Sequence, residues 1–272
     1  MFINFIKYII LGIIQGFTEP IPVSSSGHLL IFQKLLNGIQ DIDFNLLAII
    51  TNFGSFIAIV ILFKKEIIDL IQSFFRYLKT KEIKYYSNYK YCWMIILGTI
   101  PAGIMGLLVT KLDLFNFLEK NVKFVGITLL ITALFLFLIK DFKGKKEKKD
   151  ITFKDALIIG LFQVMALIPG ISRSGSTIVG GMFRNLKRET AFNFSFILYI
   201  PITLATMIIG IKDLLESSLT PIQILLYFIS AFFAFIFTYI GTKWFKQLVK
   251  DGKLIYFVYY CFIVGILILL FL

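Results

Sequence analysis

Six long apolar runs, separated by short charged connections, constrain this chain more than any other feature of its sequence. The runs are Phe44–Phe63, Tyr91–Val109, Phe124–Ile139, Ala191–Ile211, Pro221–Gly241 and Leu254–Leu272. The chain has 272 residues, is 58% hydrophobic and has a mean hydropathy of +0.87. A water-soluble domain of this size cannot bury so much apolar surface, so the lipid bilayer must be the solvent for these runs. The sequence therefore predicts an all-α integral membrane protein, a single membrane domain over residues 1–272 with about six spanning helices.

The net charge is +12, and the distribution of the basic residues among the connections predicts the orientation of the chain in the membrane. The lysine-rich connections are Lys64–Lys90, Lys140–Lys149 and Lys243–Lys253, and the mixed or acidic ones lie around Asp41/Asp43, Lys111–Lys123 and Lys212–Ser218. The positive-inside rule assigns the first set to the cytoplasm and the second set to the outside. We expect no nucleic-acid partner, because the basic residues form no contiguous soluble domain. Within the first basic loop, Glu66–Leu78 is amphipathic and is expected to lie on the membrane interface.

A helix needs about 20 apolar residues to span the bilayer. Two further apolar segments are broken by polar residues into pieces that are too short to span it alone. Gln15–His28 contains the only histidine of the chain, two prolines and three serines, and Pro169–Thr177 contains an arginine and three serines. Proline disrupts a helix interior, whereas serine favours a helix start. Each break therefore predicts a helix–loop–helix hairpin that enters the membrane and returns, over residues 2–37 and 154–185. Such backbone is tolerated at depth only inside protein or beside a wet cavity.

The two hairpins share a constant spacing of 148 residues. Gln15, Ser24, Ser26 and Gly27 match Gln163, Ser172, Ser174 and Gly175, and Phe44-Asn45 matches Phe192-Asn193 at the same spacing. Each repeat, about 1–140 and 151–272, contains one hairpin and three spans. Because three is odd, the second repeat is expected upside down, which is the inverted-topology architecture whose broken helices meet near the membrane midplane. The first hairpin would then enter from outside and the second from the cytoplasm.

Arg173 is the most informative single residue of the two loops. An arginine at membrane depth is costly and marks a functional site by default, and its planar guanidinium suits phosphate. Backbone amides of the following half-helix, with the hydroxyls of Ser172, Ser174 and Thr177, would complete an anion cradle. The alternatives are that Arg173 reaches the membrane surface or pairs with a carboxylate for packing.

The first loop offers proton-transfer and metal-binding groups. Glu19 would hold a divalent cation beside the anion, with Mg²⁺ or Ca²⁺ suited to oxygen ligands, or it would merely balance the charge of Arg173. His28 is a candidate general acid or base, or else a hydrogen-bonded core histidine. Ser25 is a candidate nucleophile activated by His28, whereas Ser24 and Ser26 cap the helix or bind substrate.

Three amides, Gln15, Asn52 and Gln163, are expected to hydrogen-bond around these groups or between helices. The residues alone thus indicate a phosphate site inside a membrane domain. They leave two functions open, namely hydrolysis of a lipid phosphoester or pyrophosphate, and transport of an anion.

The segments Gln15–His28 and Pro169–Thr177, together with Asn52–Ser55 and Phe192–Phe196, resemble the bacterial undecaprenyl-diphosphate phosphatase family, also called the bacitracin-resistance protein family. The resemblance covers nearly the whole chain. It implies hydrolysis of undecaprenyl diphosphate to the monophosphate carrier of peptidoglycan synthesis, bacitracin resistance, a divalent-cation requirement and a place in the bacterial cell membrane. A polyprenyl diphosphate lipid and the bilayer are the expected partners, and a second copy of the chain, as a homodimer, is a further candidate. The charge pattern favours an active site that opens to the outer face.

The family's functional residues carry over onto matching positions. Gln15 and Glu19 fill its (Glu/Gln)-x-x-x-Glu motif, with Glu19 as metal ligand, and His28 matches the catalytic histidine. Ser25 matches the proposed nucleophile and Arg173 the pyrophosphate clamp. The expected substrate-binding residues are Gln15, Ser24, Ser26, Asn52, Ser172, Ser174 and Thr177. Two departures stand out: Gln15 replaces a glutamate found in many members, which leaves Glu19 as the only carboxylate of the motif, and Pro20 replaces a bulkier apolar residue.

Overall fold

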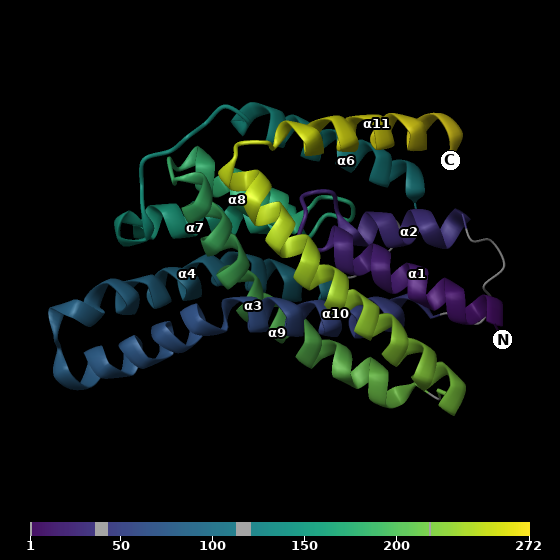
Figure 1. The fold of residues 1–272 in the computed structure, drawn as a ribbon, viewed down its shortest axis with the longest axis horizontal. Coiled ribbons are helices and arrows are strands. Elements are labelled where there is room, and N and C mark those ends of the chain that lie inside the picture. Colours follow the sequence, from purple (N-terminus) through teal and green to yellow (C-terminus); the bar gives the residue numbers. More distant parts are fainter. Residues whose placement is uncertain (1, 36–42, 113–120, 218) are drawn as a thin grey trace.

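The computed structural model describes residues 2–35, 43–112, 121–217 and 219–272, and their architecture is all-helical (Figure 1). The helices are α1 (Phe2–Thr18), α2 (Ser25–Leu35), α3 (Phe44–Thr80), α4 (Ile83–Leu112), α6 (Val122–Ile139), α7 (Phe153–Met165), α8 (Arg173–Phe183), α9 (Arg188–Glu216), α10 (Pro221–Lys250) and α11 (Ile255–Phe271). A single 3₁₀ turn, η1 (Lys148–Asp150), precedes α7. The predicted all-α class is confirmed for these residues.

Five helices of the described part of the chain, α3, α4, α6, α9 and α10, are long and apolar enough to cross a bilayer. The sixth predicted span is α11, an apolar helix of 17 residues. Large apolar side chains such as Leu270 and Ile208 are 70% and 62% exposed. Such surface is stable only against lipid, so the chain is a multi-pass membrane protein. Residues 36–42 and 113–120, which include Asp41 and part of the predicted outer connections, lie outside the described residues.

The segment Glu66–Leu78, which the sequence predicts to lie on the membrane interface, is part of a longer helix. This segment continues α3 without a break to Thr80, and α4 starts three residues later, so the two helices form a long arm (Figure 1, left). The ring centroids of Tyr77 and Tyr89 lie 4.6 Å apart across the arm, and those of Phe74 and Tyr89 lie 5.2 Å apart. The apolar face of the segment therefore packs in part against α4, a contact that amphipathicity alone does not reveal.

The two segments predicted as hairpins each contain two helices joined by a loop, α1–α2 and α7–α8, and equivalent serines start the second helices. Ser24 Oγ accepts a hydrogen bond from the Gly27 amide at 3.2 Å, and Ser172 Oγ accepts one from the Gly175 amide at 3.1 Å. These bonds satisfy amides that a helix N-terminus leaves without an intrahelical partner. The same local structure therefore recurs at the spacing of 148 residues.

The first helices of the two hairpins also pack in equivalent ways, α1 along α10 and α7 along α4. A Cβ atom added to Gly12 would lie 2.3 Å from the Ser230 carbonyl oxygen, and one added to Gly160 would lie 2.4 Å from the Gly98 carbonyl oxygen. Glycine is required at both positions because the backbones touch there. Gly12 and Gly160 are themselves 148 residues apart.

A buried carboxylate anchors the base of the second hairpin. Asp155 is 0% exposed, and its two oxygens bind Lys146 Nζ at 2.9 Å and Arg184 Nε at 2.9 Å. It also accepts from the Thr152 amide at 3.0 Å in a capping box. Burial alone would raise the pKa of Asp155, but the hydrogen bonds from Lys146, Thr152 and Arg184 outweigh it and lower that pKa. This cluster connects the loop before α7 to the end of α8.

Candidate active site

The tips of the two hairpins touch near the middle of the molecule (Figure 1). Ser174 Oγ donates to the Ile21 carbonyl oxygen at 3.2 Å, and a Cβ atom at Gly175 would lie 3.1 Å from Cβ of Pro22. Loops 153 residues apart in sequence thus form one polar centre. As expected, residues of Gln15–His28 and Pro169–Thr177 are brought together.

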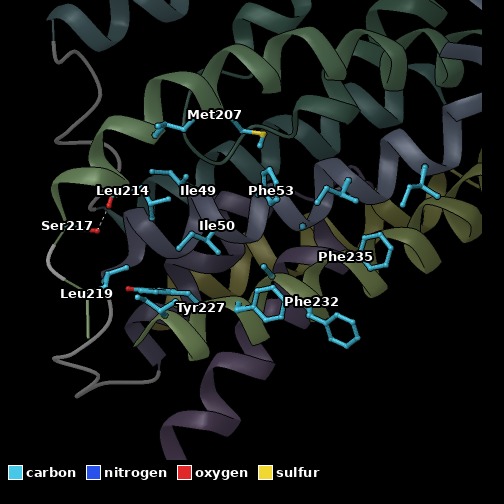
Figure 2. Close-up of a pocket in the computed structure, with 17 residues that line it drawn as sticks. Ile49, Ile50, Phe53, Met207, Leu214, Ser217, Leu219, Tyr227, Phe232 and Phe235 are labelled. Atoms are coloured by element: carbon cyan, nitrogen blue, oxygen red, sulfur yellow. Dashed lines mark hydrogen bonds between the residues drawn. The ribbon is translucent and has the colours of Figure 1, made fainter. Parts of the chain in front are cut away.

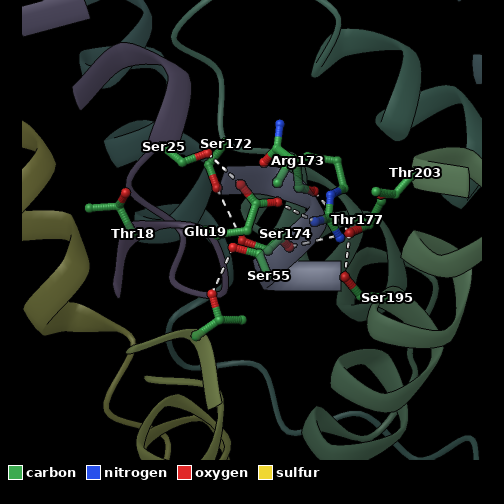
Figure 3. A network of polar contacts seen from close by, with 12 residues as sticks. Thr18, Glu19, Ser25, Ser55, Ser172, Arg173, Ser174, Thr177, Ser195 and Thr203 are labelled. Atoms are coloured by element: carbon green, nitrogen blue, oxygen red, sulfur yellow. Dashed lines mark hydrogen bonds and ion pairs between the residues drawn. The ribbon is translucent and has the colours of Figure 1, made fainter. Parts of the chain in front are cut away.

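An ion pair between the hairpins lies at this centre (Figure 3). Arg173 Nη2 donates to Glu19 Oε1 at 2.8 Å, and the two side chains are only 17% and 11% exposed. The second oxygen, Glu19 Oε2, accepts from Ser25 Oγ at 2.6 Å and from Gln15 Nε2 at 3.1 Å. Glu19 therefore pairs with Arg173, one of the alternatives left open by the sequence, and also receives the hydroxyl of the predicted nucleophile.

Arg173 is held from a second side by an aromatic ring. Its Cζ atom lies 3.8 Å from the ring centroid of Tyr199, which is 2% exposed. A guanidinium over an aromatic face gains electrostatic attraction, and more so when water is excluded. The other terminal nitrogen, Nη1, is buried and has no hydrogen-bond partner among the described residues. A buried cationic donor without a partner is costly, so this atom is available to an incoming anion.

Two of the three predicted amides, Gln15 and Asn52, form a hydrogen-bonded chain with Glu19. Gln15 Nε2 also donates to Asn52 Oδ1 at 2.6 Å, which ties α1 to α3. Gln15 Oε1 is buried and has no hydrogen-bond partner among the described residues. Gln163, which lies 148 residues after Gln15, is 2% exposed. Neither its amide nitrogen nor its amide oxygen has a hydrogen-bond partner among the residues that the structure describes.

Most of the predicted substrate-binding hydroxyls are buried and already engaged. Ser24 and Ser172 cap their helices, Ser174 bridges the loops, and Thr177 Oγ1 lies 2.5 Å from Ser195 Oγ. Ser26 is exposed instead. In this arrangement the buried hydroxyls fix the shape of the loops, while Ser25 and Ser26 remain nearer the surface.

His28 lies within the same hairpin but bonds away from Glu19. Its Nδ1 is 2.8 Å from the Ser24 carbonyl oxygen, and its Nε2 is 2.7 Å from the Tyr260 hydroxyl of α11. A carbonyl oxygen only accepts, so Nδ1 carries a proton here. The Ser25 hydroxyl donates to Glu19, whereas the sequence suggested His28 as its activating partner.

The electrostatics of the centre favour an anion. Helices α2 and α8 both begin at it, and helix N-termini present free amides and a partial positive charge. The carboxylate of Glu19 is paired with Arg173. No group of three or more His, Cys, Asp or Glu side chains that could hold a metal by itself occurs among residues 2–35, 43–112, 121–217 and 219–272. A cation here would need Glu19, neutral oxygens and oxygens from the ligand.

A separate apolar cavity of about 820 Å³ lies between α3, α9 and α10 (Figure 2). None of the predicted site residues lines it.

Three residues that contact the polar site were not predicted from the sequence, namely Tyr199, Tyr260 and Ser195. Tyrosines inside apolar runs look like ordinary core residues, and only the quoted segment Phe192–Phe196 hinted that the start of α9 matters.

The fold and this centre define a class: multi-pass helical membrane proteins in which two hairpins join a carboxylate and an arginine in one polar site. The sequence model of the family described as "Bacitracin resistance protein BacA" matches residues 8–267, and the chain belongs to this family. The resemblance found in the sequence is thereby confirmed.

Full-length relatives bear the name of a phosphatase. The chain is 43% identical to Undecaprenyl-diphosphatase 1 of Bacillus licheniformis, over 99% of each chain. It is 42% identical to Undecaprenyl-diphosphatase 2 of Bacillus thuringiensis, over 100% of this chain and 99% of the relative. It is 39% identical to Undecaprenyl-diphosphatase of Oceanobacillus iheyensis, over 100% of this chain and 98% of the relative.

Proposed function

We propose that this protein hydrolyses undecaprenyl diphosphate to undecaprenyl phosphate and inorganic phosphate. The lipid carrier would thereby be recycled for peptidoglycan synthesis, and bacitracin resistance would follow. The Glu19–Arg173 pair carries the proposal, because it puts a base and a phosphate clamp from two hairpins in one place. The names of the full-length relatives support the same substrate.

Arg173 would bind the diphosphate. Its unpartnered Nη1 would donate to the diphosphate, and the N-termini of α2 and α8 add positive potential. Fixed donors that meet the charge developing on the transferred phosphoryl group are the main source of rate in such reactions. The ring of Tyr199 keeps the guanidinium in place as Glu19 turns to other partners.

Glu19 would act as the base. Its Oε2 is 2.6 Å from Ser25 Oγ, a distance that suits proton transfer. Ser25, or a water in its place, attacks the terminal phosphorus and gives its proton to Glu19. The bond from that phosphorus to the bridging oxygen breaks, and undecaprenyl phosphate leaves with the bridging oxygen. If Ser25 attacks, water then releases phosphate from it. His28, fixed between Ser24 and Tyr260, holds the turn that aims Ser25 and stays a candidate proton donor.

The donor set also fits a divalent cation shared with the substrate. Mg²⁺ commonly uses one or two carboxylates together with phosphate oxygens and water. Glu19 and the unpartnered Gln15 Oε1 would hold it. When bound, the cation would neutralise charge on the diphosphate.

The two halves would be inverted repeats in the membrane, with the site opening outward. The equivalent packing of α1 on α10 and α7 on α4 supports the repeat, and the lysine-rich connections support the orientation. Ser26 is exposed, so in intact cells Ser26→Cys should react with a membrane-impermeant thiol reagent. Labelling only after the cells are opened would place the site on the cytoplasmic side. The parent chain is the control, since it contains Cys92 and Cys261.

The repeat also favours a second candidate, a carrier that moves a lipid phosphate across the bilayer without bond cleavage. Purified protein in detergent separates the two. Release of inorganic phosphate from undecaprenyl diphosphate supports the hydrolase. Movement of lipid in vesicles without phosphate release supports the carrier and contradicts the hydrolase. Phosphorylated Ser25 trapped during turnover would identify the nucleophile, whereas full activity of Ser25→Ala would assign the attack to water.

A further inference from the structure

The apolar cavity between α3, α9 and α10, called here the α3/α9/α10 groove, differs from the outer helix surfaces because it is concave. Met207 and Leu214 of α9 form one wall, Phe232 and Phe235 of α10 form the other, and α3 lies between them (Figure 2). Its volume is about 820 Å³. This size is in the range of pockets that enclose organic ligands.

The lining offers no free polar group to a headgroup. Its two polar side chains are turned to backbone carbonyls: Ser217 Oγ donates to the Leu214 oxygen at 2.7 Å, and the Tyr227 hydroxyl donates to the Asp43 oxygen at 3.3 Å. The other lining residues are apolar, and three of them, Phe53, Phe228 and Phe232, are at least half exposed. The chemistry of the groove therefore fits a hydrocarbon chain.

Helix α9 runs from the polar centre to the groove. Residues four apart are neighbours on a helix surface, and the steps from Tyr199 to Thr203 and from Thr203 to Met207 follow this spacing while turning gradually around α9. Tyr199 lies under Arg173, and Met207 and Ile211 line the groove. The rise from Tyr199 to Met207 is about 12 Å.

A second connection runs through α3 and α10. Gly54 forms part of the groove, and a Cβ atom there would lie 2.2 Å from the Ala231 carbonyl oxygen, so the two backbones touch. The next residue, Ser55, accepts a hydrogen bond from Thr238 Oγ1 at 2.8 Å. The Thr238 hydroxyl also lies 2.9 Å from the carbonyl oxygen of Gly16, the residue after Gln15. These contacts connect the groove, through α3 and α10, to α1 beside Gln15.

We infer that the α3/α9/α10 groove binds the isoprenoid chain of the substrate while its diphosphate lies at Arg173. This inference rests on the proposed function and extends it to chain selection. A ligand tethered at Arg173 presents its own chain to the groove at high effective concentration, which favours that chain over free bilayer lipid. Because the bilayer is equally apolar, the groove orients the chain more than it adds hydrophobic affinity.

Blocking the groove tests this. Met207→Trp fills the end nearest Tyr199, and Ile50→Trp fills it from α3. Ile208→Trp is the matched control, since Ile208 is the next residue of α9, is 62% exposed and does not line the groove. The readout is kcat/KM for phosphate release in detergent, measured with undecaprenyl diphosphate and with geranyl diphosphate, whose chain is too short to fill the groove.

We expect both filling variants to lower the ratio of long-chain to short-chain kcat/KM about tenfold, the cost of modest overpacking, and the control to leave it unchanged. A parallel loss on both lipids, or no loss, overturns the inference. Unchanged kinetics with a shift from dimer to monomer assigns the groove to a second copy of the chain and also overturns it.

A binding measurement keeps this test separate from the proposed function. Undecaprenyl phosphate carrying a photoreactive group in mid-chain should label peptides with Met207 or Phe232, and Met207→Trp should reduce that labelling. Labelling spread evenly over outward faces such as Ile208 contradicts the inference. If the wild-type protein releases phosphate from neither lipid, the hydrolase proposal fails. The labelling experiment still shows whether the lipid chain lies in the groove.

Discussion

Tyr199 is the residue whose replacement tests the geometry of the centre most sharply. Its ring lies 3.8 Å from the Arg173 guanidinium carbon, on a different helix from both hairpin tips. Tyr199→Leu removes the aromatic face and keeps an apolar side chain, whereas Tyr199→Phe keeps the face and removes only the hydroxyl. The two variants separate the cation–ring contact from the rest of the side chain.

The size of the effect follows from burial. Arg173 is 17% exposed and Tyr199 is 2% exposed, so the contact is largely desolvated. Such a contact is worth about 2 kcal/mol. If it holds the guanidinium where the phosphate must bind, its loss lowers kcat/KM about 30-fold. Tyr199→Phe should stay within about threefold of the wild-type protein, because the ring face remains.

The assay is phosphate release in detergent, with thermal unfolding as a check on folding. Tyr91→Leu is the matched control, because Tyr91 is also 2% exposed and also lies under a cation, Lys148 Nζ at 4.6 Å. It should lose stability with little change in kcat/KM. Equal losses in Tyr199→Leu and Tyr91→Leu, or equal losses in Tyr199→Leu and Tyr199→Phe, would refute the positioning role of the ring.

Three further predictions address the metal, the packing and the second hairpin. Gln15→Glu should lower the Mg²⁺ concentration for half-maximal activity about tenfold, because it adds a second carboxylate beside Glu19, and calorimetric Mg²⁺ titration should show the same shift; an unchanged affinity contradicts the assignment. Gly12→Ala should lower the free energy of unfolding by about 1–3 kcal/mol, while Gly103→Ala, which meets nothing within 4 Å, should not; equal effects contradict the packing. Asp155→Asn should cost about 1–3 kcal/mol at neutral pH. Because the pKa of Asp155 is lowered by folding, this contribution is present above pH of about 4 and fades below it, so the difference in thermal stability should narrow in acid; a constant difference argues against the ion cluster.

The two helix breaks, between α1 and α2 and between α7 and α8, were predictable because their signals are local. Prolines and serines inside apolar runs have defined conformational effects, and the spacing of 148 residues gave each hairpin a partner. The meeting of Glu19 and Arg173 followed from that pairing. Its form did not, since composition cannot show that one oxygen of Glu19 meets Arg173 while the other meets Ser25.

The contacts that could not be predicted from the sequence depend on which helix faces pack against each other. An amphipathic segment such as Glu66–Leu78 shows that one face avoids water, but both lipid and a neighbouring helix satisfy that face. Tyr260 is 232 residues from its partner His28, and Tyr199 lies in an apolar run like many others. Only tertiary packing selects these tyrosines among the 12 in the chain.

The central claim is that Arg173 and Glu19 form one phosphate-processing site across the two hairpins. The most direct measurement is phosphate release from undecaprenyl diphosphate by purified Arg173→Ala, beside Arg184→Ala, whose arginine pairs with the carboxylate of Asp155. We predict that Arg173→Ala folds but loses activity roughly 10³-fold or more, while Arg184→Ala loses stability and keeps most of its activity. Full activity of Arg173→Ala would contradict the account.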